Sequence, residues 1–205
     1  MEIVAPSKTD SASSLIHKLA SVVECLSVEG LFPTTHPLEV ELGAGDGSFL
    51  AKYATANPER NFIGVERLLG RLRKIDRKGL RAGLTNLRLV RIEASYLLEF
   101  LLPEKSVSAF HVYFPDPWPK RKHRKNRLVK ERFTELAGKV LLPNGMIYLR
   151  TDDADYFAQM VRVFEANRSF TKVETPPALS SVVTDFERNF HLRGVPTLAA
   201  AYQLR

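Results

Sequence analysis

The chain of 205 residues is long enough to form one globular domain with a full hydrophobic core, without disulfides or a structural metal. Its 30 Lys and Arg residues outnumber 23 Asp and Glu residues, and the net charge of +7 favours a polyanionic partner without distinguishing nucleic acid from a membrane surface. The single cysteine, Cys25, excludes an intramolecular disulfide, and its apolar surroundings predict a buried thiol in a reducing compartment. The chain start lacks a signal-peptide pattern and no apolar run is long enough to cross a bilayer, so we expect a cytoplasmic protein with no membrane partner.

The first predicted element is an amphipathic leading helix within residues 1–30. Apolar residues recur at helical spacing between positions 15 and 26, Ser11 precedes them as a possible N-cap, and Gly30 follows as a stop signal.

Strands and helices then alternate to the end of the chain. Helices are predicted near Phe49 and over 67–82, 129–140 and 156–164, and strands over 38–42, 62–65, 87–92, 107–114, 146–150, 170–173 and 198–204. This alternation predicts a single α/β domain over 1–205, with a doubly wound, mostly parallel seven-stranded sheet and an antiparallel edge made by the late strands. Residues 175–196, which begin at Thr175-Pro-Pro177, are expected to form a mobile surface segment.

A glycine-rich loop connects the strand at 38–42 to the following helix. In Glu41-Leu-Gly-Ala-Gly-Asp-Gly47, Gly43 and Gly45 let the backbone turn sharply beside a ligand. The dinucleotide fingerprint requires its third glycine at position 48, where the chain has Ser48, so the spacing favours a methyltransferase loop over a dehydrogenase loop. A tight turn without a ligand is the simpler alternative.

Acidic residues stand at or just after the ends of the first three strands of this alternation. Glu66 stands 21 residues after Gly45, where a carboxylate can accept hydrogen bonds from both hydroxyls of an adenosine ribose. Glu93 is placed to bind the adenine amino group, and Glu41 to hold the methionyl end of a cofactor or the loop itself. A solvated surface acid remains the alternative for Glu66, and the neighbouring Arg67 keeps a ribose-phosphate site open.

A rigid loop, Pro115-Asp-Pro-Trp-Pro119, follows the strand at 107–114. The prolines fix the backbone around Asp116, and Trp118 offers a face for stacking a base. The basic run Lys120-Arg-Lys-His-Arg-Lys-Asn-Arg127 comes next and is dense enough to neutralise several phosphates, although many such runs are only solvated surfaces. The basic helix at 67–82 is a weaker candidate for the same role. The other histidines form no metal-ligand pattern, so no metal is expected.

Taken together, these motifs resemble the bacterial tRNA (guanine-N7)-methyltransferase family over roughly residues 38–194. The resemblance is carried by Glu41-Leu-Gly-Ala-Gly45, Gly64-Val-Glu66, Phe114-Pro-Asp-Pro-Trp-Pro-Lys120, Thr151-Asp152 and Thr184-Asp-Phe-Glu187, in the order that the family shows. It implies the Rossmann-like methyltransferase fold, S-adenosylmethionine as cofactor and N7 of a variable-loop guanosine in tRNA as the methyl acceptor.

The resemblance also assigns roles to residues. The implied cofactor site consists of Glu41, Gly43, Gly45, Glu66, Glu93 and Asp116, and Asp116 is also the implied catalytic residue. The implied substrate contacts are Lys120, Asp152, Thr184, Asp185, Phe186 and Glu187. The implied RNA contacts are Lys122, His123, Arg124, Lys125, Asn126 and Arg127.

Guanine N7 carries a lone pair and no proton, so methyl transfer to it requires positioning rather than a general base. Two rival functions remain from the sequence, an NADP-dependent oxidoreductase and a tRNA-binding module without catalysis. The sequence leaves both a monomer and a homodimer open.

Overall fold

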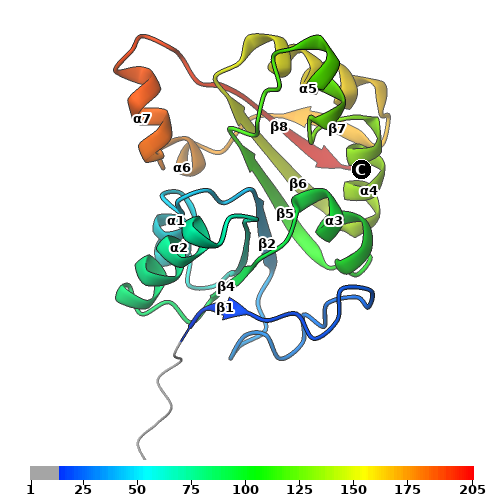
Figure 1. The fold of residues 1–205 in the computed structure, drawn as a ribbon. Helices are drawn as coiled ribbons and strands as arrows, with labels where there is room; N and C mark the ends of the chain where they lie inside the picture. The colour runs from blue at the N-terminus through cyan, green and yellow to red at the C-terminus, as the bar shows by residue number, and fades with distance from the viewer. Residues whose placement is uncertain (1–13) are drawn as a thin grey trace, which may run out of the picture.

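The computed structural model describes residues 14–205 and contains one eight-stranded sheet with the order β1-β4-β3-β2-β5-β6-β8-β7 (Figure 1). The strands are β1 (Ile16–His17), β2 (Leu38–Leu42), β3 (Asn61–Val65), β4 (Leu87–Val90), β5 (Val107–Tyr113), β6 (Leu141–Thr151), β7 (Phe170–Val173) and β8 (Leu198–Leu204). Every pair from β1 to β6 is parallel, whereas β8 runs antiparallel to both of its neighbours. The predicted doubly wound sheet with an antiparallel edge is confirmed, and the two-residue β1 is added to its seven expected strands.

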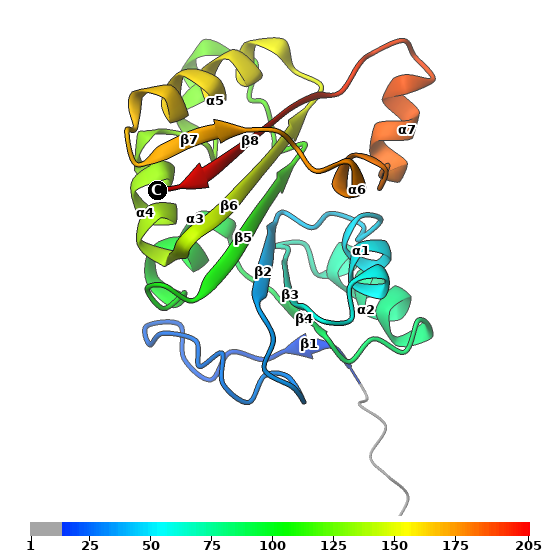
Figure 2. The ribbon, with the colours of Figure 1, turned by 180° about the vertical axis from the view of Figure 1, so that it is seen from behind.

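Helices cover both faces of this sheet (Figure 2). They are α1 (Leu50–Ala56), α2 (Leu69–Arg81), α3 (Ala94–Tyr96), the π-helix η1 (Leu97–Leu101), the 3₁₀ helix η2 (Arg121–Asn126), α4 (Glu131–Val140), α5 (Ala154–Ala166), α6 (Pro177–Ser180) and α7 (Asp185–His191). Buried side chains of η1, α4 and α5 form one core with the sheet, and those of α1, α2 and α6 form a second core on the other face.

Strand β2 is fully buried and yet carries two acids. Its apolar residues point into the core beneath α4 and α5, and the two-residue period of a strand therefore directs Glu39 and Glu41 to the opposite face. Glu39 accepts a 2.7 Å hydrogen bond from His111 Nε2 and pairs with Arg60. Burial alone would raise the pKa of Glu39, but His111 and Arg60 together lower it. Glu41 stands at the carboxyl end of the strand, where no such partners occur.

The predicted leading helix is wrong for the residues that the structure describes. Residues 14–30 contain no helix, and Ser11, the expected cap, lies outside the described residues. Leu15 instead fixes this segment to the sheet: its carbonyl accepts from Leu89 N, and its N–H donates to the carboxylate of Asp76 at 2.7 Å. Leu15 and Leu26 still reach the core, but from an extended chain rather than from one face of a helix. Val23 is 80% exposed, and Cys25 is exposed rather than buried.

Two later segments also differ in detail from the prediction. Strand β6 begins earlier than expected, and the Pro143-Asn-Gly145 turn bulges out between the pairs Val107–Leu141 and Ala109–Met146. The segment 175–196, for which no helix was expected, contains α6 and α7, and its mobility stays a prediction. None of the helices within residues 14–205 has the length and apolar composition needed to span a bilayer.

Candidate active site

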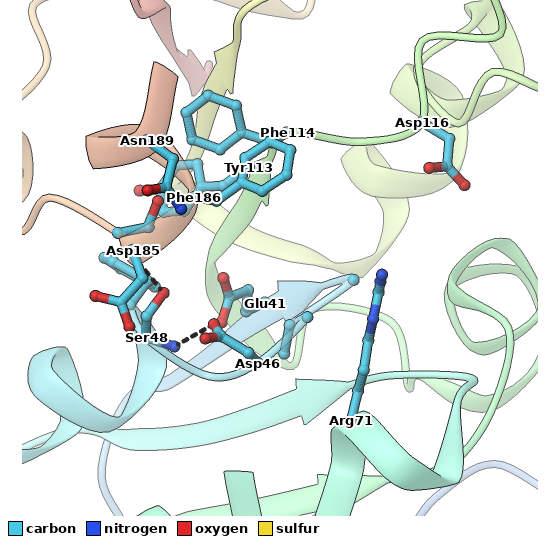
Figure 3. A pocket seen from close by; sticks show the side chains of 15 residues that line it. Glu41, Asp46, Ser48, Arg71, Tyr113, Phe114, Asp116, Asp185, Phe186 and Asn189 are labelled. Carbon is cyan, nitrogen blue, oxygen red and sulfur yellow. Dashed lines mark hydrogen bonds between the residues drawn. The ribbon is translucent and has the colours of Figure 1, made fainter. Parts of the chain in front are cut away.

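A cleft of about 360 Å³ opens at the carboxyl ends of β2 and β5, beneath α7 (Figure 3). Parallel strands of an open α/β sheet present ligand sites at this edge, because the loops after neighbouring strands diverge there. The cleft is lined from four directions: by the end of β2 and the glycine loop after it, by the residues that end and follow β5, by Arg71 of α2, and by the first turns of α7. Of the predicted cofactor and catalytic residues, Glu41, Gly43, Gly45 and Asp116 line it.

The glycine loop is held in place from the end of β3. The N–H groups of Gly43 and Ala44 both donate to the carbonyl of Val65, and Gly43 has φ +85°, a conformation that favours glycine. Glu66 accepts hydrogen bonds from Gly45 N at 3.2 Å and from Leu68 N at 2.7 Å. Glu66 therefore ties the loop to the start of α2, but it does not belong to the lining of the cleft.

Glu41 is the least satisfied acid of the described residues. Its side chain is 4% exposed and lines the cleft, and its buried Oε2 has no hydrogen-bond partner within residues 14–205. Burial, reinforced by the charges of Asp46 and Glu66, raises the pKa of Glu41 to about 8. A buried carboxyl oxygen without a partner lowers the stability of the folded state by roughly 1 to 3 kcal/mol. A cationic group bound in the cleft would supply that partner and remove this cost.

The loop that carries Asp116 has an unusual backbone and a buried anchor. Phe114 and Trp118, on either side of Asp116, have φ values of +49° and +44°, in the left-handed region that is costly for bulky residues. The anchor is Arg127, whose Nε donates a 2.7 Å hydrogen bond to the carbonyl of Pro117. Its guanidinium also binds Gln159 and Asp155 and lies over the ring of Tyr156.

This position corrects the prediction that Arg127 contacts RNA. Its side chain is only 1% exposed, because all three of its nitrogen groups are used inside the protein. The rest of the run forms η2 on the surface: Lys120, Lys122, Arg124, Lys125 and Asn126 are exposed, and His123 is half-buried. Trp118 packs edge-on against His123 with ring centroids 5.9 Å apart and does not line the cleft.

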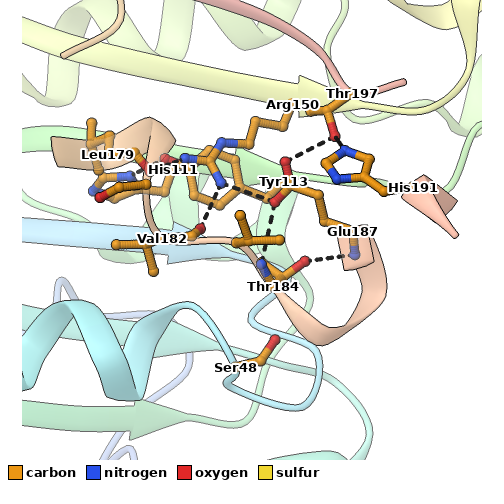
Figure 4. Close-up of polar contacts among 12 residues, drawn as sticks. Ser48, His111, Tyr113, Arg150, Leu179, Val182, Thr184, Glu187, His191 and Thr197 are labelled. Atoms are coloured by element: carbon orange, nitrogen blue, oxygen red, sulfur yellow. Dashed lines mark hydrogen bonds and ion pairs between the residues drawn. The ribbon is translucent and has the colours of Figure 1, made fainter. Parts of the chain in front are cut away.

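Segment 175–196 folds over the cleft and is fastened by Arg150 (Figure 4). This buried β6 residue donates to the carbonyls of Leu179 and Val182 and forms a 3.2 Å ion pair with Glu187. Thr184 and Glu187 form a capping box at the start of α7, which leaves Thr184, Asp185 and Phe186 in the lining of the cleft.

Glu187, a predicted substrate contact, is buried at the start of α7. It is 5% exposed, and it accepts hydrogen bonds from Arg150, from the N–H of Thr184 and from the hydroxyl of Thr197. Both of its oxygens therefore help to hold α7, and Glu187 does not belong to the lining of the cleft, so its role as a substrate contact stays a prediction.

Three further predicted residues lie outside the lining of the cleft. Glu93 caps α3 by accepting from Tyr96 N at 2.9 Å, and its side chain is exposed. Asp152, directly after β6, is half-buried, and Lys120, at the start of η2, is exposed.

The cleft also contains residues that sequence analysis did not place there. Phe114 and Phe186 form an aromatic wall with ring centroids 5.4 Å apart, and Asn189 follows one helical turn later. Arg71 rises into the cleft from α2, with Asp116 on the far side of the opening (Figure 3). Ser48 joins the glycine loop to α7 by accepting a 3.2 Å hydrogen bond from Asp185 N. Phe186 was among the predicted substrate contacts, whereas the other four stood in segments that the sequence had singled out without being assigned to this site: Ser48, Arg71, Phe114 and Asn189.

Comparisons with known proteins agree with this geometry. A family model described as putative methyltransferase matches residues 35–200. A protein of Halorhodospira halophila, named tRNA (guanine-N(7)-)-methyltransferase, is 34% identical over 88% of this chain and 80% of its own length. A protein of the same name from Rubrobacter xylanophilus is 34% identical over 82% of this chain and 77% of its own. The crystal structure of the 16S rRNA methyltransferase KamB superposes with a TM-score of 0.59 at 16% identity, over 82% of this chain and 87% of that one, a likeness of fold alone.

Proposed function

The chain belongs to the tRNA (guanine-N7)-methyltransferases, S-adenosylmethionine-dependent enzymes of class I, and we propose that its cleft transfers a methyl group to N7 of a variable-loop guanosine in tRNA. The observation that carries this proposal is that Glu41, Gly45 and Asp116, from the ends of two different strands, line one cleft. The tRNA substrate makes the cytoplasm the compartment that we propose for the reaction.

The residues of the cleft fit S-adenosylmethionine. The orphaned Oε2 of Glu41 is a buried acceptor that suits the cofactor's ammonium group, and an ammonium ion beside it would favour the ionised carboxylate. The glycine loop leaves the backbone beside Gly43 and Gly45 accessible to a ligand, since no other atom approaches within 4 Å of where a Gly43 side chain would begin. When bound, the cofactor supplies an electrophilic methyl group on a sulfonium. We assign the ribose hydroxyls to Glu66, whose oxygens retain free lone pairs beside the loop.

The protein's part in the reaction is to place the guanine and to stabilise charge. Guanine N7 needs no deprotonation, so the protein contributes in-line positioning and exclusion of water. Methylation leaves positive charge on the guanine ring, and the Asp116 carboxylate, fixed by the loop that Arg127 anchors, is placed to stabilise it. Phe114 and Phe186 supply aromatic surface for the base, and Asp185 supplies polar contacts beside it. Lys120 and Asp152 remain proposed substrate contacts outside the lining of the cleft.

The decisive experiment incubates the protein with labelled S-adenosylmethionine and unmodified tRNA, followed by strand cleavage at 7-methylguanosine to map the label. We expect a single labelled site in the variable loop. Label on another atom, or none, would contradict the proposal. A thermal-shift control distinguishes the NADP-enzyme alternative: S-adenosylhomocysteine should raise the melting temperature and NADPH should not.

A further inference from the structure

Helix α2 presents a positive surface that borders the cleft. Residues 67–81 contain seven Lys and Arg residues and one acid, Asp76, so this short segment carries nearly the net charge of the whole chain. Asp76 is already bound to Leu15 N and Ser14, and it neutralises none of these cations by an ion pair within residues 14–205.

The arrangement of these cations is ordered by the helix. Leu72, Ile75 and Gly79 bury one face of α2 against the sheet. At 100° per residue, Arg71, Lys74, Lys78 and Arg81 form a stripe on another face, with Arg77 beside it. The stripe extends for about 15 Å at 1.5 Å per residue, which is long enough to pass several phosphates. We call these five residues the α2 stripe.

The α2 stripe is costly for the isolated protein. Lys74 and Lys78, and also Arg77 and Arg81, are like-charged pairs at i,i+4 spacing, each of which destabilises a helix by roughly 0.2 to 0.5 kcal/mol. Lys78 pairs with Asp46 at 3.3 Å, but Lys74, Arg77 and Arg81 have no carboxylate within 4 Å among the described residues. A surface that served only solubility would intersperse both signs of charge.

The stripe leads from the cleft to a second hollow. Arg71 lines the cleft itself. Lys78 and Arg81 line a neighbouring depression together with Lys52, the glycine loop at Gly47 and Ser48, and one acid, Asp185. Figures 1 and 2 show α2 beside α1. The buried side chains of these two helices pack on one face of the sheet, whereas those of α4 and α5 pack on the other.

We propose that the α2 stripe binds the sugar-phosphate backbone of the RNA whose base enters the cleft. This inference rests on the proposed function and adds a second electropositive surface, separate from η2, to the path of the RNA. Charge complementarity favours a polyanion. RNA is favoured over an anionic membrane because the apolar face of α2 is buried in the core and cannot insert into lipid, and because Arg71 leads into the cleft.

The test uses the full chain with Lys74, Arg77 and Arg81 all replaced by Gln, which retains good helix propensity. The matched control replaces Lys139, Arg168 and Lys172 by Gln, which removes the same charge from exposed positions near α4, α5 and β7. Affinity for unmodified tRNA is measured as a function of salt concentration, and affinity for S-adenosylhomocysteine by calorimetry.

We expect the α2 variant to bind tRNA at least roughly tenfold more weakly at 0.15 M salt, and its log-log salt slope to fall by about 2 to 3, since each phosphate contact contributes about 0.7 to 0.9. Affinity for S-adenosylhomocysteine and thermal stability should match the wild type, and the control variant should keep the wild-type slope. An unchanged slope in the α2 variant, or an equal fall in the control, would overturn the inference. Loss of binding to anionic vesicles with tRNA binding intact would also overturn it. If the wild type binds tRNA through α2 but forms no 7-methylguanosine, the proposed function fails while this inference stands.

Discussion

The guanidinium of Arg127 donates a 2.7 Å hydrogen bond to the carbonyl of Pro117, the residue that directly follows Asp116. A side chain from the end of the basic run thereby fixes the loop that carries the proposed catalytic carboxylate. Gln159 and Asp155, both on α5, accept hydrogen bonds from the same guanidinium. Arg127 therefore connects the loop to a helix that is packed in the core.

The first prediction follows from this contact. Arg127→Lys keeps the charge but loses the forked donor geometry, so Pro117, Gln159 and Asp155 cannot all be bound at once. We expect stability to fall by about 1 to 3 kcal/mol. The kcat for methyl transfer should fall roughly 10- to 100-fold, because a small displacement of a catalytic group is costly. Urea denaturation and steady-state kinetics measure both effects.

The salt dependence of tRNA binding distinguishes this positioning role from an RNA contact. Arg127→Gln removes the charge altogether and should leave the log-log slope unchanged, because the wild-type side chain is buried. Lys122→Gln, at an exposed position of the same run, is the control and should lower the slope by about 0.7 to 0.9. If the slope falls equally in both variants, Arg127 contacts RNA after all.

The second prediction concerns Asp116. Asp116→Asn preserves size but removes the charge that faces the developing guanine cation, so kcat should fall about 100-fold or more. Because Asp116 is exposed at the rim of the cleft, stability should change by no more than about 0.5 kcal/mol. Near-normal turnover would refute its catalytic role.

The third prediction is a pH dependence of stability that originates in Glu41. Burial raises the pKa of this carboxyl to about 8 in the folded chain, well above its unfolded value, so the folded state holds an extra proton between these two pKa values. Stability should therefore decline as the pH rises through this window and level off above about pH 8. Glu41→Gln removes the decline, so the variant should gain stability over the wild type at pH 8 by an amount on the order of a few kcal/mol, but not at pH 4. A constant difference between the two proteins across this range would contradict the assignment.

Cofactor binding tests the same group independently. At pH 7 the buried Glu41 is mostly protonated, and an ammonium group placed beside it should drive the proton off. Calorimetry of S-adenosylhomocysteine binding in buffers of different ionisation enthalpy should report release of close to one proton. Glu41→Gln should abolish this release, and release that persists in the variant would assign the proton to another residue.

These groups differ in how far the sequence could reveal them. Glu41, Gly45 and Asp116 were predictable because Glu41 stands at the carboxyl end of one strand, and Gly45 and Asp116 follow strands within a few residues. The strand directions alone bring these ends to one edge. The roles of Arg127 and Glu187 were not, because burial of a charged side chain depends on partners elsewhere in the chain, such as Gln159 for Arg127 and Arg150 for Glu187. An arginine within a run of basic residues is expected from sequence to be exposed, whereas Arg127 is buried.

The helix predicted for the leading segment was wrong for a related reason. The apolar spacing between Leu15 and Leu26 matches a helix, but the edge of β4 offers parallel backbone partners to the chain at Ile16, and tertiary pairing overrides local periodicity. Packing against α2 fixes the same segment. Gly79 of α2 has no side chain, and this lets Leu15 approach the helix closely, so the segment that was predicted as a helix instead packs beside one. Neither relationship is visible in a window of local sequence.

The fourth prediction concerns Glu66, which joins Gly45 to the start of α2. Glu66→Ala removes an acceptor for the N–H of Gly45 together with the proposed ribose contact, so affinity for S-adenosylhomocysteine should fall roughly 10- to 100-fold. Glu93→Ala is the matched control. It removes a helix-capping carboxylate outside the lining of the cleft and should lower stability by about 1 kcal/mol with a smaller loss of affinity. If Glu93→Ala weakens cofactor binding more than Glu66→Ala does, Glu93 contacts the cofactor, as the sequence predicted for the adenine amino group.

The last prediction concerns the exposed part of the basic run on η2. Replacing Lys122, Arg124 and Lys125 together by Gln should lower the salt slope of tRNA binding and raise the KM for tRNA while leaving cofactor affinity unchanged. Arg124 already forms a 3.2 Å ion pair with Asp155, so the fall in slope should lie nearer to two contacts than to three, about 1.4 to 1.8. Combined with the three substitutions on α2, the effects on the slope should add, because the two surfaces share no residue and independent sites are close to additive. If the six-residue variant has the same slope as the more affected of the two triple variants, only one of the two surfaces contacts the RNA.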